Sequence, residues 1–361
     1  MRLQKISIRF ITIFILASAL LEACVPAVII PIASGKIAFL LPETKTARYE
    51  TQDLPIFKAK LKSLGFDIEK NLIYSNANQD ASAQQSQAEA ALTNGAKVLV
   101  LDPVDSSAAA AIANLAKVKG VPVIAYDRLI KDSDGVDYYI SFDNEQVGRL
   151  QGQSLLEALK GKTYPTIVMI NGSPTDNNVT LFKKGAHSVL DGKVNIAKEY
   201  DTPDWSPDKA QEEMTQALTA LGNKVDGVYA ANDGTAGGAI AAMKAAGLKP
   251  LPPVTGQDAE LVAIQRILVG EQYMTVYKAI KPEAEIAAEF AFALLMNKPV
   301  PLNRVNGKTY NGKIDVPSIV LVPVAVTKAN VKDTVVADEF WKMIDLCKGD
   351  YAKACTEAGI K

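Results

Sequence analysis

Apolar and polar positions along this chain form two alternating kinds of segment. Short, continuous apolar runs, such as 98–101 and 121–125, are typical of strands buried on both faces of a parallel sheet. Longer stretches with helical spacing of apolar residues lie between most of them, and the alternation indicates an α/β fold. The pattern predicts strands at 37–41, 68–75, 97–102, 121–127, 138–142, 166–171, 194–200, 226–231, 253–257, 273–277 and 318–326. It predicts helices at 50–64, 80–94, 106–119, 144–160, 179–190, 207–221, 235–247, 259–269 and 282–297.

The order of these elements indicates two similar α/β blocks, after which the chain returns between them. The first block ends near Phe142 and the second near Tyr277, and one more helix, a polar loop and a late strand follow. A late strand after two complete blocks implies three crossings between them, near 141–143, 276–279 and 318–324. No low-complexity linker separates the blocks, which favours a hinge of adjacent strands over a flexible tether.

Planar polar residues gather where the predicted strands end. Ligands of open α/β sheets bind outside the carboxyl ends of the strands, so we expect these residues to converge although they lie far apart in sequence. They are Asp127, Arg128, Asn178, Asn232, Asp258 and Lys278, and the first strand adds Arg48 and Tyr49. Carboxylates, amides and guanidinium groups offer hydrogen-bond forks to adjacent hydroxyls, and an aromatic ring offers a flat apolar surface. This combination predicts a site for a neutral polyol.

The first 23 residues are typical of a secretory signal. Three basic residues precede an apolar run of 12 residues, FITIFILASALL, which is shorter than the ~20 residues of a membrane span. The following Leu21-Glu22-Ala23-Cys24 resembles a bacterial lipoprotein cleavage box and predicts lipidation of Cys24, although Glu22 departs from the small or apolar residues of that box. An ordinary signal peptide or an uncleaved anchor is the alternative.

Charge and length narrow the class of protein. Residues 1–23 carry three of the 39 Lys and Arg residues and one of the 40 Asp and Glu residues, which leaves 36 and 39 and a net charge of −3. This balance argues against a nucleic-acid partner, because phosphate binding needs a basic surface. The remaining ~340 residues exceed a usual single core and suggest two domains.

The residues for covalent chemistry or metal binding are few. Cys347 and Cys355 are the cysteines left after Cys24, and an exported context permits a disulfide between them, with two free thiols as the alternative. A zinc site would need four ligands, and His187 is distant in sequence. The chain has no G-x-S-x-G motif, and its two Gly-Lys-Thr triplets lack the upstream glycine of a phosphate loop. We therefore expect no catalytic residue, no metal and no cofactor.

Six motifs taken together resemble the bacterial solute-binding proteins of sugar ABC transporters, most closely their xylose-binding and multiple-sugar-binding members. The resemblance covers residues 36 to 336. It implies the type I periplasmic binding protein fold, in which two Rossmann-like lobes are joined by a three-segment hinge. The motifs, in order, are AYDRLI, YYISFDNEQVG, NGSPTDNN, ANDGTAGGAI, GQDAE and TVYK.

The resemblance also implies roles in sugar binding. Arg48 and Tyr49 match an Arg-aromatic pair that donates to hydroxyls and stacks on one face of the sugar, although Trp is usual in place of Tyr. Trp205 matches a loop tryptophan that packs on the other sugar face. The remaining implied contacts are Asp127, Arg128, Asn178, Asn232, Asp258 and Lys278. Structural alternatives stay open for some of them: an ion pair for Asp127 and Arg128, a turn for Asn232, loop packing for Trp205, and a surface charge at the hinge for Lys278. Asp176 and Asn177 are interpreted as helix-cap and turn residues.

The expected organisation follows from these observations. Residues 1–23 are a signal peptide of the lipoprotein type and 24–35 a linker. The N-terminal lobe comprises 36–141 and 279–318, and the C-terminal lobe comprises 142–278 and 319–330. A C-terminal tail follows at 331–361, and the family resemblance assigns no role to it. We expect an exported, periplasmic or cell-surface monomer that is anchored to the membrane by lipid. It would bind a monosaccharide, xylose or a related pentose or hexose, and deliver it to an ABC transporter permease. The alternative is a sensor that presents sugar to a chemoreceptor or sensor kinase.

Overall fold

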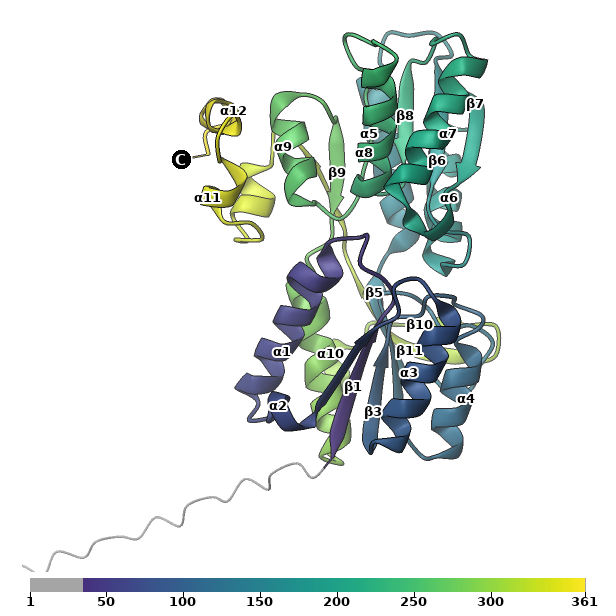
Figure 1. The fold of residues 1–361 in the computed structure, drawn as a ribbon, viewed down its shortest axis with the longest axis vertical. Coiled ribbons are helices and arrows are strands. Elements are labelled where there is room, and N and C mark those ends of the chain that lie inside the picture. Colours follow the sequence, from purple (N-terminus) through teal and green to yellow (C-terminus); the bar gives the residue numbers. More distant parts are fainter. Residues whose placement is uncertain (1–34, 361) are drawn as a thin grey trace, which may run out of the picture. The chain divides into compact units, whose positions relative to one another are not determined.

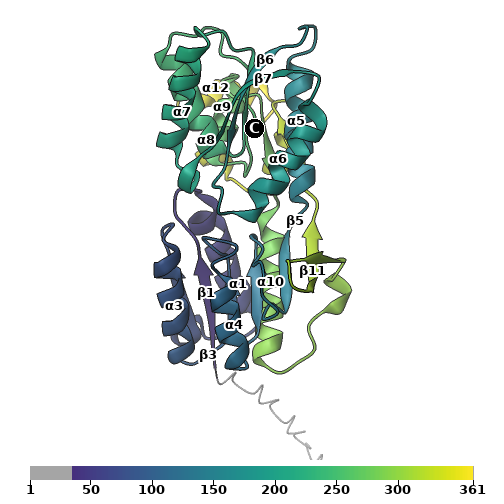
Figure 2. The ribbon, with the colours of Figure 1, turned by 90° about the vertical axis from the view of Figure 1, so that its right-hand side faces the viewer.

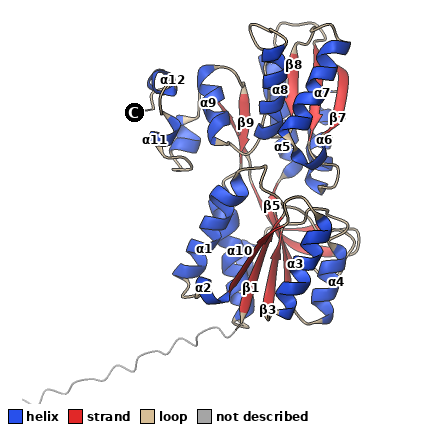
Figure 3. Cartoon of the chain, viewed as in Figure 1, coloured by secondary structure: helices blue, strands red, loops and turns tan. Residues whose placement is uncertain are grey.

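A computed structural model describes residues 35–360 of the protein (Figure 1). The predictions for the signal segment and Cys24 lie outside the described residues, as does most of the linker. None of the helices within residues 35–360 has the length and apolar character that a bilayer crossing requires. The described chain forms two α/β lobes, each with helices on both faces of a sheet (Figure 3).

The first lobe is built on a seven-stranded sheet. Its strands are parallel except for β10, which pairs antiparallel with β11 at one edge. The central strands are continuous apolar runs because both faces are covered by helices. In spatial order the strands are β10 (Gly307–Tyr310), β11 (Asp315–Leu321), β5 (Tyr138–Phe142), β4 (Val123–Tyr126), β3 (Ala96–Leu101), β1 (Lys36–Leu41) and β2 (Leu72–Asn76).

The second lobe holds a three-stranded parallel sheet and a two-stranded antiparallel one. The three-stranded sheet has the order β7 (Asn195–Asp201), β6 (Thr166–Asn171) and β8 (Gly227–Ala230). The other pairs β12 (Val324–Thr327) with β9 (Met274–Tyr277). Single bridges from Val254 to Val228 and from Gln257 to Val276 connect them.

Four local expectations differ from the structure. The first half of the strand expected at 68–75 is a short helix, α2 (Ile68–Asn71), because the Asp67 side chain accepts a hydrogen bond from the N–H of Lys70 and caps a helical turn. The strand expected at 253–257 is reduced to the two bridges, because Pro253 has no N–H to donate and the backbone turns at Asp258. The polar loop after the helix at 282–297 contains strand β10, whose polar residues suit an exposed edge. The strand expected at 318–326 divides into β11 and β12, which belong to different sheets.

Helices cover the sheets in pairs (Figure 2). In the first lobe α1 and α10 pack on one face and α3 and α4 on the other, and in the second lobe α5 and α6 oppose α7 and α8. The helices are α1 (Leu54–Ser63), α2 (Ile68–Asn71), α3 (Ala81–Thr93), α4 (Ala110–Val118), α5 (Asn144–Ala158), α6 (Asn177–Leu190), α7 (Pro207–Ala220), α8 (Asp233–Ala245), α9 (Leu261–Val269), α10 (Ile280–Leu295), α11 (Met343–Leu346) and α12 (Tyr351–Glu357). Short turns of π-helix lie at Tyr49–Asp53 and Lys332–Val336, and 3-10 turns at Pro203–Trp205 and Leu302–Arg304.

The chain passes between the lobes three times. It leaves the first lobe after β5 and enters α5, returns after β9 into α10, and crosses again between β11 and β12. β11, which precedes the third passage, pairs with β5, which precedes the first passage. β12, which follows the third passage, pairs with β9, which precedes the second. Hydrogen-bonded strands therefore connect the third passage to the first in one lobe and to the second in the other.

The C-terminal tail packs beside these passages. Its apolar residues form one buried cluster with α9 and with Phe142, Tyr277 and Ile280, which flank the first two passages. A disulfide joins Cys347 to Cys355 and ties α11 to α12. The amide of Gln265 in α9 donates to the carbonyl oxygen of Leu346 at 3.1 Å, which holds the tail against the second lobe.

Candidate ligand-binding site

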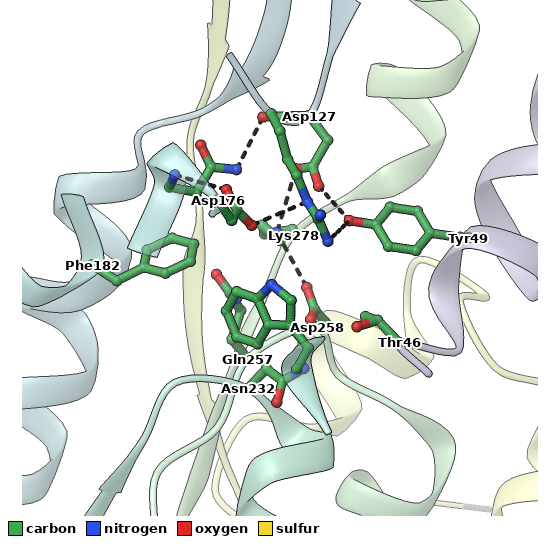
Figure 4. Close-up of a pocket in the computed structure, with 12 residues that line it drawn as sticks. Thr46, Tyr49, Asp127, Asp176, Phe182, Asn232, Gln257, Asp258 and Lys278 are labelled. Atoms are coloured by element: carbon green, nitrogen blue, oxygen red, sulfur yellow. Dashed lines mark hydrogen bonds and ion pairs between the residues drawn. The ribbon is translucent and has the colours of Figure 1, made fainter. Parts of the chain in front are cut away.

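A small cavity lies where loops from the two lobes face one another (Figure 4). The space between the lining atoms amounts to about 250 Å³, part of which is open to solvent. Its wall combines carboxylates, amides, cations and three aromatic rings. The lining residues are Thr46, Tyr49, Asp127, Arg128, Asp176, Asn178, Phe182, Trp205, Asn232, Gln257, Asp258 and Lys278.

Asp127 contacts several other residues at the cavity wall. It follows β4 with φ 54°, a left-handed conformation that Asp tolerates better than most residues. Its Oδ2 accepts a hydrogen bond from the Tyr49 hydroxyl at 2.9 Å, and its Oδ1 lies 3.4 Å from Nη1 of Arg48. The same oxygen lies 3.6 Å from Nζ of Lys278, so one carboxylate joins three segments of the chain.

The charges around Asp127 fix its protonation. Burial alone would raise the pKa of the Asp127 carboxyl, but the positive charges of Arg48, Lys278 and Arg128 outweigh burial and hold that pKa well below its usual range. Burial likewise opposes the charge on Lys278, and Asp127 and Asp258 outweigh it, so the pKa of Lys278 is raised. Asp127 is therefore an anion and Lys278 a cation whenever the cavity is formed near neutral pH.

Two helices of the second lobe begin at the cavity. Asp176 caps α6, and its side chain accepts a hydrogen bond from the backbone N–H of Asn178 at 2.8 Å. Asn232 caps α8, where its Oδ1 accepts from the N–H of Thr235 at 2.8 Å in a capping box. The caps place these polar side chains at the helix N-termini that line the cavity.

Contacts between the lobes cross the cavity wall. Nε of Arg128 lies 3.0 Å from Oδ2 of Asp176, and both side chains are buried. The amide of Asn178 donates to the carbonyl oxygen of Asp127 at 3.1 Å, while its own Oδ1 accepts from Asn144 at 2.9 Å. These bonds require the loops after β4 and β6 to stay close together.

The aromatic side of the cavity depends on a glycine. The Phe182 and Trp205 rings meet edge to face with centroids 6.4 Å apart. A Cβ at Gly172 would overlap the indole ring of Trp205, so a side chain there would displace the ring. The indole N–H of Trp205 and Oε1 of Gln257 are buried and form no hydrogen bond within residues 35–360. Buried polar atoms are normally paired, so these two are suited to a polar ligand.

The structure brings together eight of the nine residues expected at the site. Tyr49, Asp127, Arg128, Asn178, Trp205, Asn232, Asp258 and Lys278 all line the cavity. Arg48 is not in the lining: its Nη2 lies 2.7 Å from Asp53 and from Glu283, while its Nη1 lies 3.4 Å from Oδ1 of Asp127. A direct contact between Arg48 and the ligand stays a prediction.

Four lining residues were not among the expected contacts. Asp176 is the helix cap that the sequence indicates, and it also lines the cavity. Gln257 is the last residue of the strand expected at 253–257 and directly precedes Asp258, a position that could have identified it. Phe182 lies within α6 and Thr46 in the loop after β1, and no motif distinguishes either of them.

Comparison with known protein families and relatives is consistent with this geometry. A family model described as a periplasmic binding protein domain matches residues 37–299. The chain is 40% identical over 316 residues to the D-xylose-binding periplasmic protein of Escherichia coli (strain K12), and the matched region covers 86% of this chain and 92% of that protein. It is 40% identical over 287 residues to the multiple sugar-binding periplasmic protein SbpA of Azospirillum brasilense, and the matched region covers 73% of this chain and 79% of that protein.

Solved structures share the architecture. An ABC transporter solute-binding protein from Clostridium phytofermentans with bound β-D-glucose matches with a TM-score of 0.78 and 31% identity, over 86% of this chain and 99% of that one. A carbohydrate transporter solute-binding protein from Chloroflexus aurantiacus in complex with D-glucose matches with a TM-score of 0.77 and 32% identity, over 86% and 97%. These matches confirm the predicted two-lobed α/β fold.

Proposed function

The chain belongs to the periplasmic binding protein family, and we propose on that basis that it binds one monosaccharide outside the cytoplasm and delivers it to an ABC transporter permease. The observation that carries the proposal is the small polar cavity between the lobes, with its aromatic side at Phe182 and Trp205. The relatives are named for xylose or for several sugars, so xylose or a related pentose or hexose is the proposed ligand.

The charge distribution of the wall supports a neutral ligand. The carboxylates Asp127 and Asp258 both lie near Lys278, with closest N–O distances of 3.6 and 3.2 Å, and Asp176 is paired with Arg128. No side of the cavity therefore presents unpaired charge of one sign to a charged solute. Oxygens and nitrogens held in such pairs still have lone pairs and N–H groups that suit the hydroxyls of a polyol.

We expect the aromatic rings to bind the apolar side of the sugar. The C–H groups of a monosaccharide form a flat apolar patch, and stacking on Trp205 with Phe182 beside it would bury that patch. The indole N–H and Gln257 Oε1, which are unpaired within the described residues, would acquire a hydroxyl partner. A buried polar atom without a hydrogen-bond partner costs free energy, so a ligand that supplies the partner favours the bound state.

Release and uptake would require the lobes to separate. The cavity wall takes residues from both lobes, and we propose that the three passages between them act as the hinge. The ion pair between Arg128 and Asp176 would then break on opening and form again on closure. The same holds for the hydrogen bond from Asn178 to the Asp127 carbonyl. The permease would recognise the closed arrangement.

The remaining parts of the proposal concern the location and class of the protein. We propose that residues 1–23 are removed on export, that Cys24 carries lipid, and that the mature protein is a monomer held at the membrane. We also propose that it is a binding protein and not an enzyme. Sugar recovered chemically unchanged after long incubation with the protein would agree with this, whereas a converted product would contradict it.

A thermal-shift screen of the mature protein against xylose, arabinose, ribose, glucose and galactose tests the proposed function, followed by calorimetry on each positive sugar. A ligand at 100 times its Kd stabilises the folded state by about 2.7 kcal/mol, which is easily measured. Asp258→Ala is the matched control, because it removes one carboxylate of the cavity wall and should abolish most of the shift. Absence of a shift with every sugar in the wild-type protein would contradict the proposal.

A further inference from the structure

The backbone that carries Asp258 is in an uncommon conformation. Asp258 has φ 91° and the next residue, Ala259, has φ 51°, so two consecutive residues with side chains occupy the left-handed region. Such residues are uncommon, and surrounding contacts must hold them in place. The position of the Asp258 carboxylate at the cavity therefore depends on whatever fixes this turn.

Strand β9 holds the N–H side of the turn. The N–H of Asp258 donates to the carbonyl oxygen of Val276 at 2.9 Å, and the N–H of Ala259 donates to the hydroxyl of Thr275 at 3.2 Å. The carbonyl side is held from elsewhere. The indole N–H of Trp341, in the C-terminal tail, donates to the carbonyl oxygen of Ala259 at 2.7 Å.

The segment Asp338–Trp341, here called the tail loop, reaches two other segments that carry cavity residues. The Tyr277 hydroxyl, next in sequence to Lys278, donates to Oδ2 of Asp338 at 3.1 Å. The Gln52 amide, in the turn that begins with Tyr49, donates to the carbonyl oxygen of Phe340 at 3.2 Å. The tail loop thus contacts three chain segments from behind the cavity without lining it.

Aromatic packing fixes the tail loop itself. The Phe340 ring lies edge to face with Tyr277 on one side and Trp341 on the other, at centroid distances of 5.1 and 5.4 Å. Phe340 also belongs to the buried cluster that includes Leu346 and Cys355 of the tail. The position of Trp341 is therefore set by packing, which suits a donor that must hold one carbonyl in one place.

We propose that Trp341 is a positioning residue for sugar binding: its hydrogen bond to the Ala259 carbonyl fixes the turn that presents the Asp258 carboxylate to the ligand. This inference rests on the proposed function. It assigns a role to the tail, which adds no residue to the cavity wall. Trp341 acts through Asp258 and does not contact the sugar.

A double-mutant cycle in the full mature chain tests the inference. Trp341→Phe keeps an aromatic ring against Phe340 and removes the N–H donor, so we expect sugar binding to weaken about fivefold, as for one lost hydrogen bond. In an Asp258→Asn background, whose own weakened binding is measured first, the same substitution should change the Kd less than twofold, because the carboxylate that it positions is already gone. Trp341→Tyr also removes the indole N–H and allows the cycle to be repeated if Trp341→Phe fails to fold.

The control separates positioning from general loosening of the tail. Gln265→Leu removes the hydrogen bonds to the carbonyls of Asp345 and Leu346 but leaves the tail loop contacts intact, so the Kd should stay within twofold of wild type. In sugar-free protein, hydrogen exchange at Asp258 and Ala259 should speed up in Trp341→Phe and not in Gln265→Leu. Equal losses of affinity in both variants, or a fivefold loss that persists beside Asp258→Asn, would overturn the inference. Wild-type protein that binds no sugar would instead contradict the proposed function.

Discussion

The backbone N–H of Ser106 donates to the carbonyl oxygen of Thr175 at 3.0 Å, although the two residues belong to different lobes. Two further bonds lie beside it: the Thr175 hydroxyl donates to the Val104 carbonyl at 3.1 Å, and the Asn177 N–H donates to Oγ of Ser106 at 3.1 Å. The pocket lining includes neither Ser106 nor Thr175. The lobes therefore hold each other directly, apart from any contact that a ligand would make.

Ser106→Ala should weaken sugar binding without altering any residue of the cavity wall. It removes the acceptor for the Asn177 N–H, so we expect about a fivefold higher Kd, mainly through faster dissociation, since the closed arrangement loses one hydrogen bond. Stopped-flow kinetics of sugar release measures this. Ser107→Ala, at the neighbouring exposed serine, is the control and should release sugar at the wild-type rate. Slower association with unchanged dissociation would contradict the expectation.

Gly172→Ala should displace the indole of Trp205. The added methyl group would overlap the ring, so we expect a loss of affinity of tenfold or more while the protein stays folded. Calorimetry gives the affinity, and circular dichroism checks the fold. Gly234→Ala is matched in size, and its new methyl group would meet only ordinary contacts at 3.5 Å or more, so its affinity should be close to wild type. Unchanged sugar binding by Gly172→Ala would show that the ring position is unimportant.

Trp205 should report ligand binding by its fluorescence. Trp341 is the other tryptophan in the chain and does not line the cavity, so a change on adding sugar should vanish in Trp205→Phe and persist in Trp341→Phe. Loss of the larger ring should also weaken binding, by ~0.5–1.5 kcal/mol beyond the lost contact area. Small-angle scattering of the wild-type protein should show a smaller radius of gyration with sugar. An identical scattering profile at saturating sugar would rule out closure.

Glu260→Gln should alter how stability depends on pH. Burial raises the pKa of the Glu260 carboxyl, and repulsion from Asp233 and Asp258 adds to it despite the attraction of Arg266. A carboxyl whose pKa is raised by folding stabilises the protein fully below its unfolded pKa of about 4.3, and this contribution is lost as the pH rises through the folded value.

Urea unfolding between about pH 4.5 and pH 8 measures this effect. The wild-type protein should lose more stability than Glu260→Gln as the pH rises through this range. Glu157→Gln, at a carboxylate 67% exposed, is the control and should follow the wild-type curve. Parallel curves for all three proteins would mean that Glu260 ionises normally.

The disulfide should be present in exported protein and should stabilise the tail. The cysteines are 8 residues apart, and a loop this short gives an entropic gain below ~3 kcal/mol. Alkylation without reduction should leave Cys347 and Cys355 unlabelled, and alkylation after reduction should label both. Thermal unfolding should show a lower Tm for Cys347→Ser/Cys355→Ser. Two thiols that react without reduction would refute the bond.

Much of the site could be predicted because its residues follow strand ends. Asp127, Asn232 and Lys278 each come directly or soon after an apolar run, so topology alone carries them to one edge. Phe182 was not predicted, because its presence at the cavity depends on the rotational setting of α6, which sequence periodicity does not fix to a single residue. The pairing of Arg48 with Glu283 was not predicted, because the two residues lie 235 positions apart.

Local backbone chemistry explains the remaining differences in the fold. A strand was expected at 253–257, but the proline at its start and the turn at Asp258 leave only isolated bridges. The tail gave no indication of its contacts, because the Trp341 bond joins positions 82 residues apart. Long-range pairs of this kind are decided by packing and leave no mark in the local pattern.

Three covalent passages between the lobes restrict the directions in which the lobes can move. Bending about an axis near all three passages changes few backbone angles, whereas a twist or a sideways slide would have to stretch at least one of them. If the lobes open as proposed, their motion would follow nearly a single coordinate, and little orientational entropy would be lost when they meet. We expect that substitutions in the cavity wall can change which ligand is preferred without changing how the lobes move. Such a scaffold can acquire a new specificity without redesign of its mechanics.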